Sequence, residues 1–396
     1  MDKSKRIPVY YWFPVMASVC LGFVFIAIPP VAESYMQLFG VSYTGLSFFL
    51  SALFVGHSLI QVPGGIIVDR LGVAYSLYLG LFLQLIPTLL PFLWPESLVF
   101  GCLMRFITGV GSGILFLAMV KAIIILASPE HVERAQGLQG AAFSFGSMLP
   151  YLTLPMWGNW GWAAAYAIGS LLCLILLVCI GKLPLKKLQK DMHAPKISFG
   201  ELLQICLRTL TRRNIVILGC VHGFSFGTIN TVASWLPLLL KELSEGQQAT
   251  LWAMTTGGMF FVAGIARIFS GELGYRFKKI HVILVCLMIS ILLLLGVSFT
   301  SSPYIVLILG LGIGLVCGFT YSSVFILTSR YVLDGYMATG IGAMNTLANV
   351  INILMVFILG IVRERYESFS LGLVCMGGAA LIVWCIALAN RKHLME

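Results

Sequence analysis

Long apolar segments separated by short polar breaks run through almost the whole chain. A helix needs about 20 consecutive, mostly apolar residues to cross the hydrocarbon core of a bilayer. By this criterion the sequence predicts twelve membrane-spanning helices, at residues 10–36, 44–68, 73–93, 97–127, 135–157, 161–181, 214–240, 249–271, 280–300, 303–329, 336–361 and 369–390. The pattern is that of an all-α polytopic membrane protein.

The composition supports this prediction and excludes other classes. Of the 396 residues, 59% are hydrophobic and 10% are charged, whereas soluble domains carry about 25% charged residues. One globular core cannot bury so much apolar surface, so we expect a lipid bilayer around the chain. The net charge of +10 does not indicate a nucleic-acid partner, because the basic residues lie in short loops between apolar runs. The ten cysteines lack metal-ligand spacing, and we expect neither a metal nor a cofactor.

The basic residues also predict the topology. With the N-terminus in the cytoplasm, 19 of the 25 Lys and Arg residues fall in cytoplasmic segments and three in outer loops, while Arg105, Lys121 and Arg267 lie within apolar runs. This bias follows the positive-inside rule. We therefore expect both termini in the cytoplasm, and the short loops favour the inner (plasma) membrane of a prokaryote.

Two halves are visible in the sequence. The longest polar stretch, residues 182–213, is rich in lysine and arginine and contains two prolines. We interpret it as a cytoplasmic linker between six-helix bundles at residues 1–181 and 214–396. Leu21-Gly22-Phe23 recurs as His222-Gly223-Phe224, and Gly65…Arg70 recurs as Gly271…Arg276. Both offsets are close to half the chain, which predicts two pseudo-symmetric bundles around a midplane cavity.

Three motifs carry a family resemblance. The break between the second and third runs reads Gly65-Ile66-Ile67-Val68-Asp69-Arg70-Leu71-Gly72. This resembles the G-x-x-x-D-R-x-G loop of the major facilitator superfamily. The second half contains a weaker copy, Arg267-x-x-x-Gly271-x-x-x-Tyr275-Arg276, in which Tyr275 replaces the acid. The fourth run contains Arg105-x-x-Thr108-Gly109-x-Gly111-x-Gly113, which is similar to the pattern of the family's fourth helix.

The resemblance implies a secondary transporter that works by alternating access. Two bundles would rock about a central site for a small-molecule substrate, with a proton or sodium ion as candidate partners, and the family is usually monomeric. It also implies a switchable latch at the inner loops, formed by Gly65, Asp69, Arg70, Gly72, Arg267, Gly271 and Arg276. The alternative is that the loop charges only anchor the topology.

Ionisable groups within spanning helices are costly, and each is therefore a functional candidate. Arg105 is the first, because it lies nine residues after Glu96, about 13 Å along the helix axis. In the resembled family, helices 1, 4, 7 and 10 line the cavity. Arg105 would then bind an anionic substrate, or it is a structural arginine bonded to backbone carbonyls; the sequence leaves both open.

Other polar residues complete the candidate set. Glu33 follows Pro29-Pro30 near the outer surface, where a gate role is favoured over ion coupling. His57 and His222 can titrate near neutral pH, and His222 is favoured because helix 7 lines the family's cavity. The remaining candidates are uncharged and are explained equally well by interhelical hydrogen bonds: Asn230, Tyr321, Asn345 and Asn349.

Basic groups within the runs outnumber acids, which favours an anionic or zwitterionic solute such as an organic acid or amino acid, moved by symport or along its own gradient. The alternative is a drug/proton antiporter that exports lipophilic compounds. A channel, an ATP-driven pump and an enzyme are disfavoured, because no repeated filter residues, P-loop or clustered catalytic residues are visible.

Overall fold

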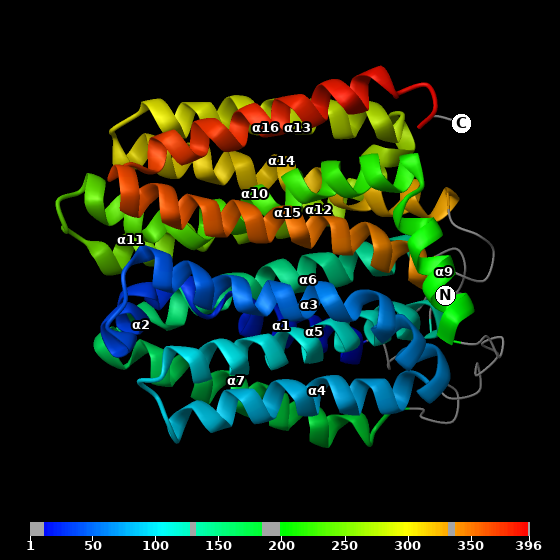
Figure 1. The fold of residues 1–396 in the computed structure, drawn as a ribbon, viewed down its shortest axis with the longest axis horizontal. Helices are drawn as coiled ribbons and strands as arrows, with labels where there is room; N and C mark the ends of the chain where they lie inside the picture. The colour runs from blue at the N-terminus through cyan, green and yellow to red at the C-terminus, as the bar shows by residue number, and fades with distance from the viewer. Residues whose placement is uncertain (1–11, 127–131, 184–198, 332–336, 395–396) are drawn as a thin grey trace, which may run out of the picture.

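The computed structural model describes residues 12–126, 132–183, 199–331 and 337–394, and this part of the chain contains long helices and no strand (Figure 1). The helices run side by side along one axis. Helix α9 and the C-terminal end lie at one end of the bundle, which we call the linker end; we call the opposite end the far end.

The helices of the N-terminal half are α1 (Trp12–Ile26), η3 (Pro29–Val31), α2 (Ala32–Phe39), α3 (Tyr43–Leu71), α4 (Val73–Leu89), η4 (Leu90–Phe92), α5 (Leu98–Leu126), α6 (Val132–Thr153), η6 (Pro155–Trp160) and α7 (Gly161–Ile180). After α9 (Phe199–Leu210), the C-terminal half consists of α10 (Arg213–Leu243), α11 (Ala249–Thr256), α12 (Gly258–Arg276), α13 (Lys279–Phe299), α14 (Pro303–Arg330), α15 (Met337–Tyr366) and α16 (Phe369–Ala389).

Each predicted apolar run corresponds to one long helix or to consecutive helices. The first run is broken at Pro29-Pro30, because proline has no backbone N–H to continue the helix. Within the described residues, eleven helical segments are long and apolar enough to cross a membrane. The twelfth run is α6, whose polar residues include Gln136 and Gln139, and it packs between α1 and α12.

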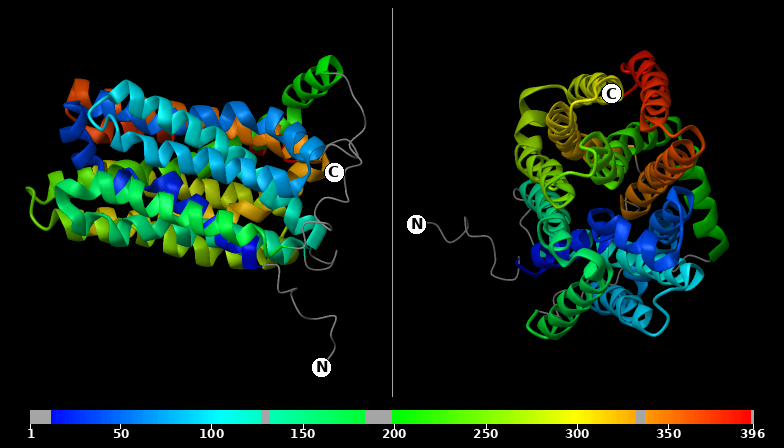
Figure 2. Two further views of the ribbon diagram at one scale, coloured as in Figure 1. Left: turned by 90° about the horizontal axis from the view of Figure 1, so that it is seen from below. Right: turned by 90° about the vertical axis from the view of Figure 1, so that its left-hand side faces the viewer.

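The two halves repeat the same packing. In the first half, α1 packs on α6, α3 on α5, and α4 on both α5 and α7. In the second half, α10 packs on α15, α12 on α14, and α13 on both α14 and α16. Every pair has its counterpart at the same place in the other half, so the fold consists of two pseudo-symmetric six-helix bundles, which Figure 2 shows end-on. The linker limits of 182–213 stay a prediction, since residues 184–198 lie outside the described residues.

The bundles meet along two helix pairs, α3 with α15 and α6 with α12. Within the first bundle, the glycines of α5 allow close approach of its neighbours. A Cβ atom on Gly109 would lie 2.1 Å from the Leu53 carbonyl oxygen and 2.8 Å from the His57 backbone nitrogen. Only a residue without a side chain allows α3 and α5 to approach this closely.

We expect Gly109→Ala to lower stability by about 1–3 kcal/mol, because the added methyl group forces α3 and α5 apart. The matched control is Gly378→Ala on α16, where a Cβ atom would meet nothing within 4 Å. Thermal melting of the purified proteins in detergent checks this prediction. Equal melting temperatures for the two variants would contradict the packing described here.

Candidate functional site

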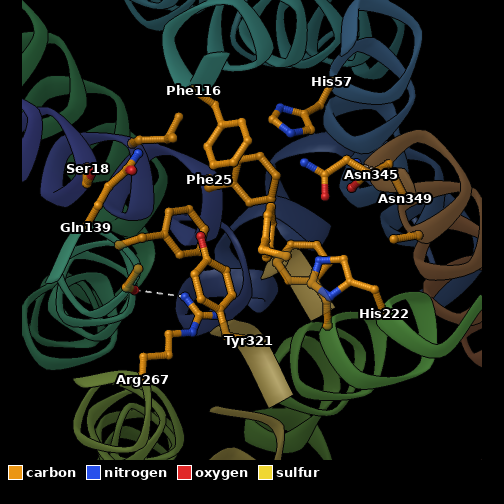
Figure 3. Close-up of a pocket in the computed structure, with 16 residues that line it drawn as sticks. Ser18, Phe25, His57, Phe116, Gln139, His222, Arg267, Tyr321, Asn345 and Asn349 are labelled. Carbon is orange, nitrogen blue, oxygen red and sulfur yellow. Dashed lines mark hydrogen bonds between the residues drawn. The ribbon is translucent and has the colours of Figure 1, made fainter. Parts of the chain in front are cut away.

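A cavity lies between the two bundles and is lined by both (Figure 3). Its walls come from α1, α3, α5 and α6 on one side and from α10, α12, α14 and α15 on the other. The space between these walls, including the opening to solvent, is about 610 Å³. Much of the wall is aromatic, formed by Phe25, Phe116, Phe143, Phe226 and Phe325.

Arg267 places a positive charge in this cavity. It is 5% exposed, and its Nη1 donates a hydrogen bond to the Gly140 carbonyl oxygen at 2.9 Å. The guanidinium lies 4.6 Å from the centre of the Tyr321 ring, and its Nε has no hydrogen-bond partner. No carboxylate is among the described residues that line the cavity. A guanidinium with unused donors and no counter-charge is well suited to bind an anion.

The sequence placed Arg267 near the inner edge, as part of the latch, whereas the structure places it on the cavity wall. The difference comes from the length of α12, which continues to Arg276, beyond the predicted end at residue 271. Arg267 therefore lies nine residues from the end of the helix, about 13 Å along its axis.

Both candidate histidines line the cavity. The His222 ring stacks on Phe226 with centroids 5.6 Å apart, meets the edge of Phe325 at 5.4 Å, and leaves Nδ1 without a partner. The His57 ring nitrogens instead bond to Ser112 at 2.8 Å and to Gln61 at 2.7 Å. His57 and His222 thus present different chemistry to the same space.

Tyr321, Asn345 and Asn349 also line the cavity. Asn349 donates through Nδ2 to the Asn345 carbonyl at 2.9 Å, and its Oδ1 has no partner. The sequence analysis missed Gln139, which stands opposite these asparagines in Figure 3. The sequence feature that could have indicated Gln139 is its spacing of three residues from Gln136, because residues three apart share one face of a helix.

Arg105 is buried, with 4% of its surface exposed, but it is not among the residues that line the cavity. Its two terminal nitrogens donate to the carbonyl oxygens of Val24 at 3.1 Å and Phe25 at 3.3 Å. These carbonyls belong to the end of α1, and Pro29 cannot donate to that of Phe25. The second interpretation of the sequence, a structural arginine bonded to backbone carbonyls, describes these contacts.

Two further candidates also lie away from the lining. Asn230 is buried on α10 and donates to the Phe226 carbonyl of its own helix at 2.7 Å. Glu33 borders a second cavity at the far end, where it forms an ion pair with Lys241 of the other bundle. This position agrees with a gate role rather than with direct contact to a substrate in the central cavity.

Apart from Arg267, the residues of the predicted latch belong to the linker ends of α3 and α12. Gly72 ends α3 with φ of +81°, a conformation that favours glycine. Gly65 and Arg70 lie in the last turns of α3, and Arg276 ends α12. The side chain of Asp69 and the surroundings of Gly271 lie outside the described residues, and the latch stays a prediction.

Polar contacts join the two bundles at the far end. Besides the pair of Glu33 and Lys241, the Tyr43 hydroxyl donates to Glu242 at 2.6 Å. Glu364 accepts from the Ser42 hydroxyl at 2.7 Å and from the Thr44 amide at 2.8 Å. On the linker side, a smaller cavity shares Gln139, Tyr321 and Phe325 with the central one and adds Gln136, Ser322 and Ile341. These contacts thus bridge the bundles at the far end, and the two cavities that share residues lie one after the other towards the linker end.

Comparisons with known proteins agree with this architecture. The family model described as Major Facilitator Superfamily matches residues 15–356. A putative tartrate transporter of Agrobacterium vitis is 22% identical over 420 aligned positions, which cover 98% of this chain and 93% of that protein. The crystal structure of a D-xylose-proton symporter has a TM-score of 0.76 at 16% identity, covering 94% of this chain and 96% of that one. The nucleoside transporter NupG has a TM-score of 0.75 at 11% identity, with coverages of 96% and 99%.

Proposed function

This chain belongs to the major facilitator superfamily and is a multi-pass membrane transporter of small molecules, and from that premise we propose that its substrate is a small organic acid, carried as an anion. The observation that supports this proposal is the isolated guanidinium of Arg267 in the cavity between the bundles. An anion would supply the missing counter-charge and accept the unused hydrogen bonds.

The lining also distinguishes between classes of substrate. The ammonium group of an amino acid would find neutral acceptors but no negative charge, since no carboxylate is among the described lining residues. An organic acid with hydroxyl groups has suitable partners, since Gln139, Asn345 and Asn349 offer amide donors and acceptors. The relative named a putative tartrate transporter supports the same class. Export of a lipophilic cation is not favoured, because such a molecule would meet Arg267 without finding an acid.

We propose alternating access as the mechanism. Arg267 lies on α12 and bonds to Gly140 of α6, so an anion bound there would contact the interface at which the bundles move. In this proposal the linker end and both termini face the cytoplasm, the protein is a monomer in the plasma (inner) membrane, and the latch residues hold the alternative, outward-facing state. We propose a proton, rather than sodium, as the coupling ion.

Thermal-shift screening of the purified protein tests the substrate class. The panel contains L-tartrate, succinate, glycine, D-xylose and the lipophilic cation tetraphenylphosphonium. A ligand that binds the native state at 100 times its Kd stabilises it by about 2.7 kcal/mol. We expect one or both organic acids to raise the melting temperature, and the sugar and the cation to leave it unchanged. Stabilisation by the cation alone would contradict the proposal and favour drug export.

A further inference from the structure

His57 belongs to a hydrogen-bond chain that runs from Ser112 through the imidazole ring to Gln61. The Ser112 hydroxyl donates to the Gly109 carbonyl at 2.7 Å, so its oxygen accepts the proton on His57 Nδ1 at 2.8 Å. On the other side of the ring, Gln61 Nε2 donates to His57 Nε2 at 2.7 Å. With the Gln61 amide in this orientation, the ring is neutral, with its proton on Nδ1 and a lone pair on Nε2.

Gln61 can serve this ring in either charge state. Its side chain is fully buried, and its Oε1 has no hydrogen-bond partner. If His57 Nε2 gained a proton, a half-turn of the Gln61 amide would bring Oε1 to face it, because the two ends of an amide occupy nearly equivalent positions. The new bond would be charge-assisted and about twice as strong as the neutral one. The hydrogen bonds from Ser112 through His57 to Gln61 thus accommodate an added proton without movement of the backbone.

The surroundings of His57 are mostly apolar. The ring lies 5.2 Å from Phe25 of α1 and 6.4 Å from Phe116 of α5, measured between centroids. Three titratable or charged groups lie on the cavity wall with His57, namely His222, Arg267 and Tyr321. The helices around His57 carry the others: Cys20 of α1; Tyr43, Asp69 and Arg70 of α3; Tyr75 and Tyr78 of α4; Cys102, Arg105 and Lys121 of α5; and Arg363, Glu364, Arg365 and Tyr366 of α15. Of the carboxylates, Asp69 is twelve residues along α3, about 18 Å away on the axis, and Glu364 is at the far end of α15.

We propose that Nε2 of His57 is the proton-binding site that couples this transporter to a proton, an inference that rests on the proposed function. A dicarboxylate brings two negative charges into a cavity where Arg267 supplies one positive charge. A proton from water, bound at His57 Nε2, supplies the second. Burial of an uncompensated charge is costly, so the anion and the proton favour each other's binding and leave together. Figure 3 shows Arg267 and His57 on opposite sides of the pocket, so the two positive charges would stand apart around the bound anion.

Gln61 also links this site to the interface between the bundles. A Cβ atom on Gly342 of α15 would lie 2.9 Å from the Gln61 carbonyl oxygen. The amide that responds to the charge on His57 is therefore carried by a residue in direct contact with the other bundle. The proton site thus lies one side chain away from the interface between α3 and α15.

Calorimetric titration of the full-length protein with L-tartrate and with succinate, in buffers of different ionisation enthalpy, counts the protons taken up. Near pH 7 we expect about one proton per anion for the wild type and none for His57→Gln. The matched control is His222→Gln, which changes the other buried histidine of the cavity. We expect this variant still to take up one proton for each anion bound, even if its affinity for the anion changes. A count of one in His57→Gln, or its loss in His222→Gln, would overturn the proposal.

Gln61→Leu is a second variant that keeps His57. Because it removes the acceptor for the added proton, we expect its count to fall below half of the wild-type value, and an unchanged count would refute the role of Gln61. Binding of either acid by the wild type without proton uptake overturns this proposal alone. Failure of both acids to bind overturns the proposed function, and this proposal with it.

Discussion

Replacement of Arg267 by glutamine is expected to weaken binding of L-tartrate about 100-fold while the protein remains folded. The variant loses charge-assisted hydrogen bonds, each worth about 1.5–3 kcal/mol, and a loss of about 2.8 kcal/mol corresponds to a factor of 100 in affinity. Glutamine is shorter than arginine and places its amide near the position of Nε, so the variant also loses the 2.9 Å hydrogen bond to the Gly140 carbonyl. Calorimetry on the purified variant measures the affinity directly.

The matched control is Arg105→Gln. Both arginines are buried and both donate to backbone carbonyls, but Arg105 is not part of the cavity lining. We expect Arg105→Gln to lower the melting temperature, since the carbonyls at the end of α1 lose their donors, and to change the affinity by less than about threefold, well under 1.4 kcal/mol. The reverse pattern, in which Arg105→Gln abolishes binding and Arg267→Gln does not, would make Arg105 the anion site.

Removal of the acids that tie the far end shut is expected to open that end. The test is a triple variant, Glu33→Gln, Glu242→Gln and Glu364→Gln. Glu33 forms an ion pair with the other bundle, and Glu242 and Glu364 accept hydrogen bonds from it. Contacts of this exposed kind contribute about 0.2–1 kcal/mol each. Loss of all three acids is therefore expected to shift the equilibrium between the closed and the open far end by about tenfold, which corresponds to 1.4 kcal/mol.

A cysteine at position 47 reports this opening. Ser47 is fully buried, and a Cβ atom on Gly360 of the other bundle would lie 2.7 Å from its own Cβ. We expect Ser47→Cys to react about ten times faster with a water-soluble thiol reagent in the triple-variant background, with the site resolved by mass spectrometry because the chain has ten native cysteines. The control is Glu245→Gln, an exposed acid in the turn between α10 and α11. Equal rates in the triple variant and the wild type would show that these contacts do not hold the far end closed.

The length and order of the helices could be predicted well from the sequence. Spanning helices need a minimum apolar length, and charges mark their ends, so the predicted run at 303–329 matches α14 at Pro303–Arg330. The break of the first run follows from Pro29-Pro30, where the backbone forms a 3-10 turn between α1 and α2. The break inside the run at 249–271, which divides into α11 and α12, has no such signal and was not predicted.

The site was only partly predictable, because an apolar helix does not reveal which face points to the protein interior. Asn345 and Asn349 share one face and do line the cavity. Arg105 and Arg267 both lie within apolar runs, and their depth along the helix could be estimated. Their direction could not, since it depends on the neighbouring helices: one arginine meets the broken end of α1, and the other meets open space.

Counterflow in proteoliposomes tests the central claim most directly. Vesicles that contain the purified protein are loaded with unlabelled L-tartrate and diluted into trace labelled L-tartrate, with Arg267→Gln and Arg105→Gln vesicles in parallel. The account predicts transient accumulation of label with the wild type, a rate lowered about 100-fold with Arg267→Gln, in line with the loss of about 2.8 kcal/mol of binding, and accumulation retained with Arg105→Gln. Accumulation that persists unchanged in Arg267→Gln would contradict the assignment of this cavity as the anion site.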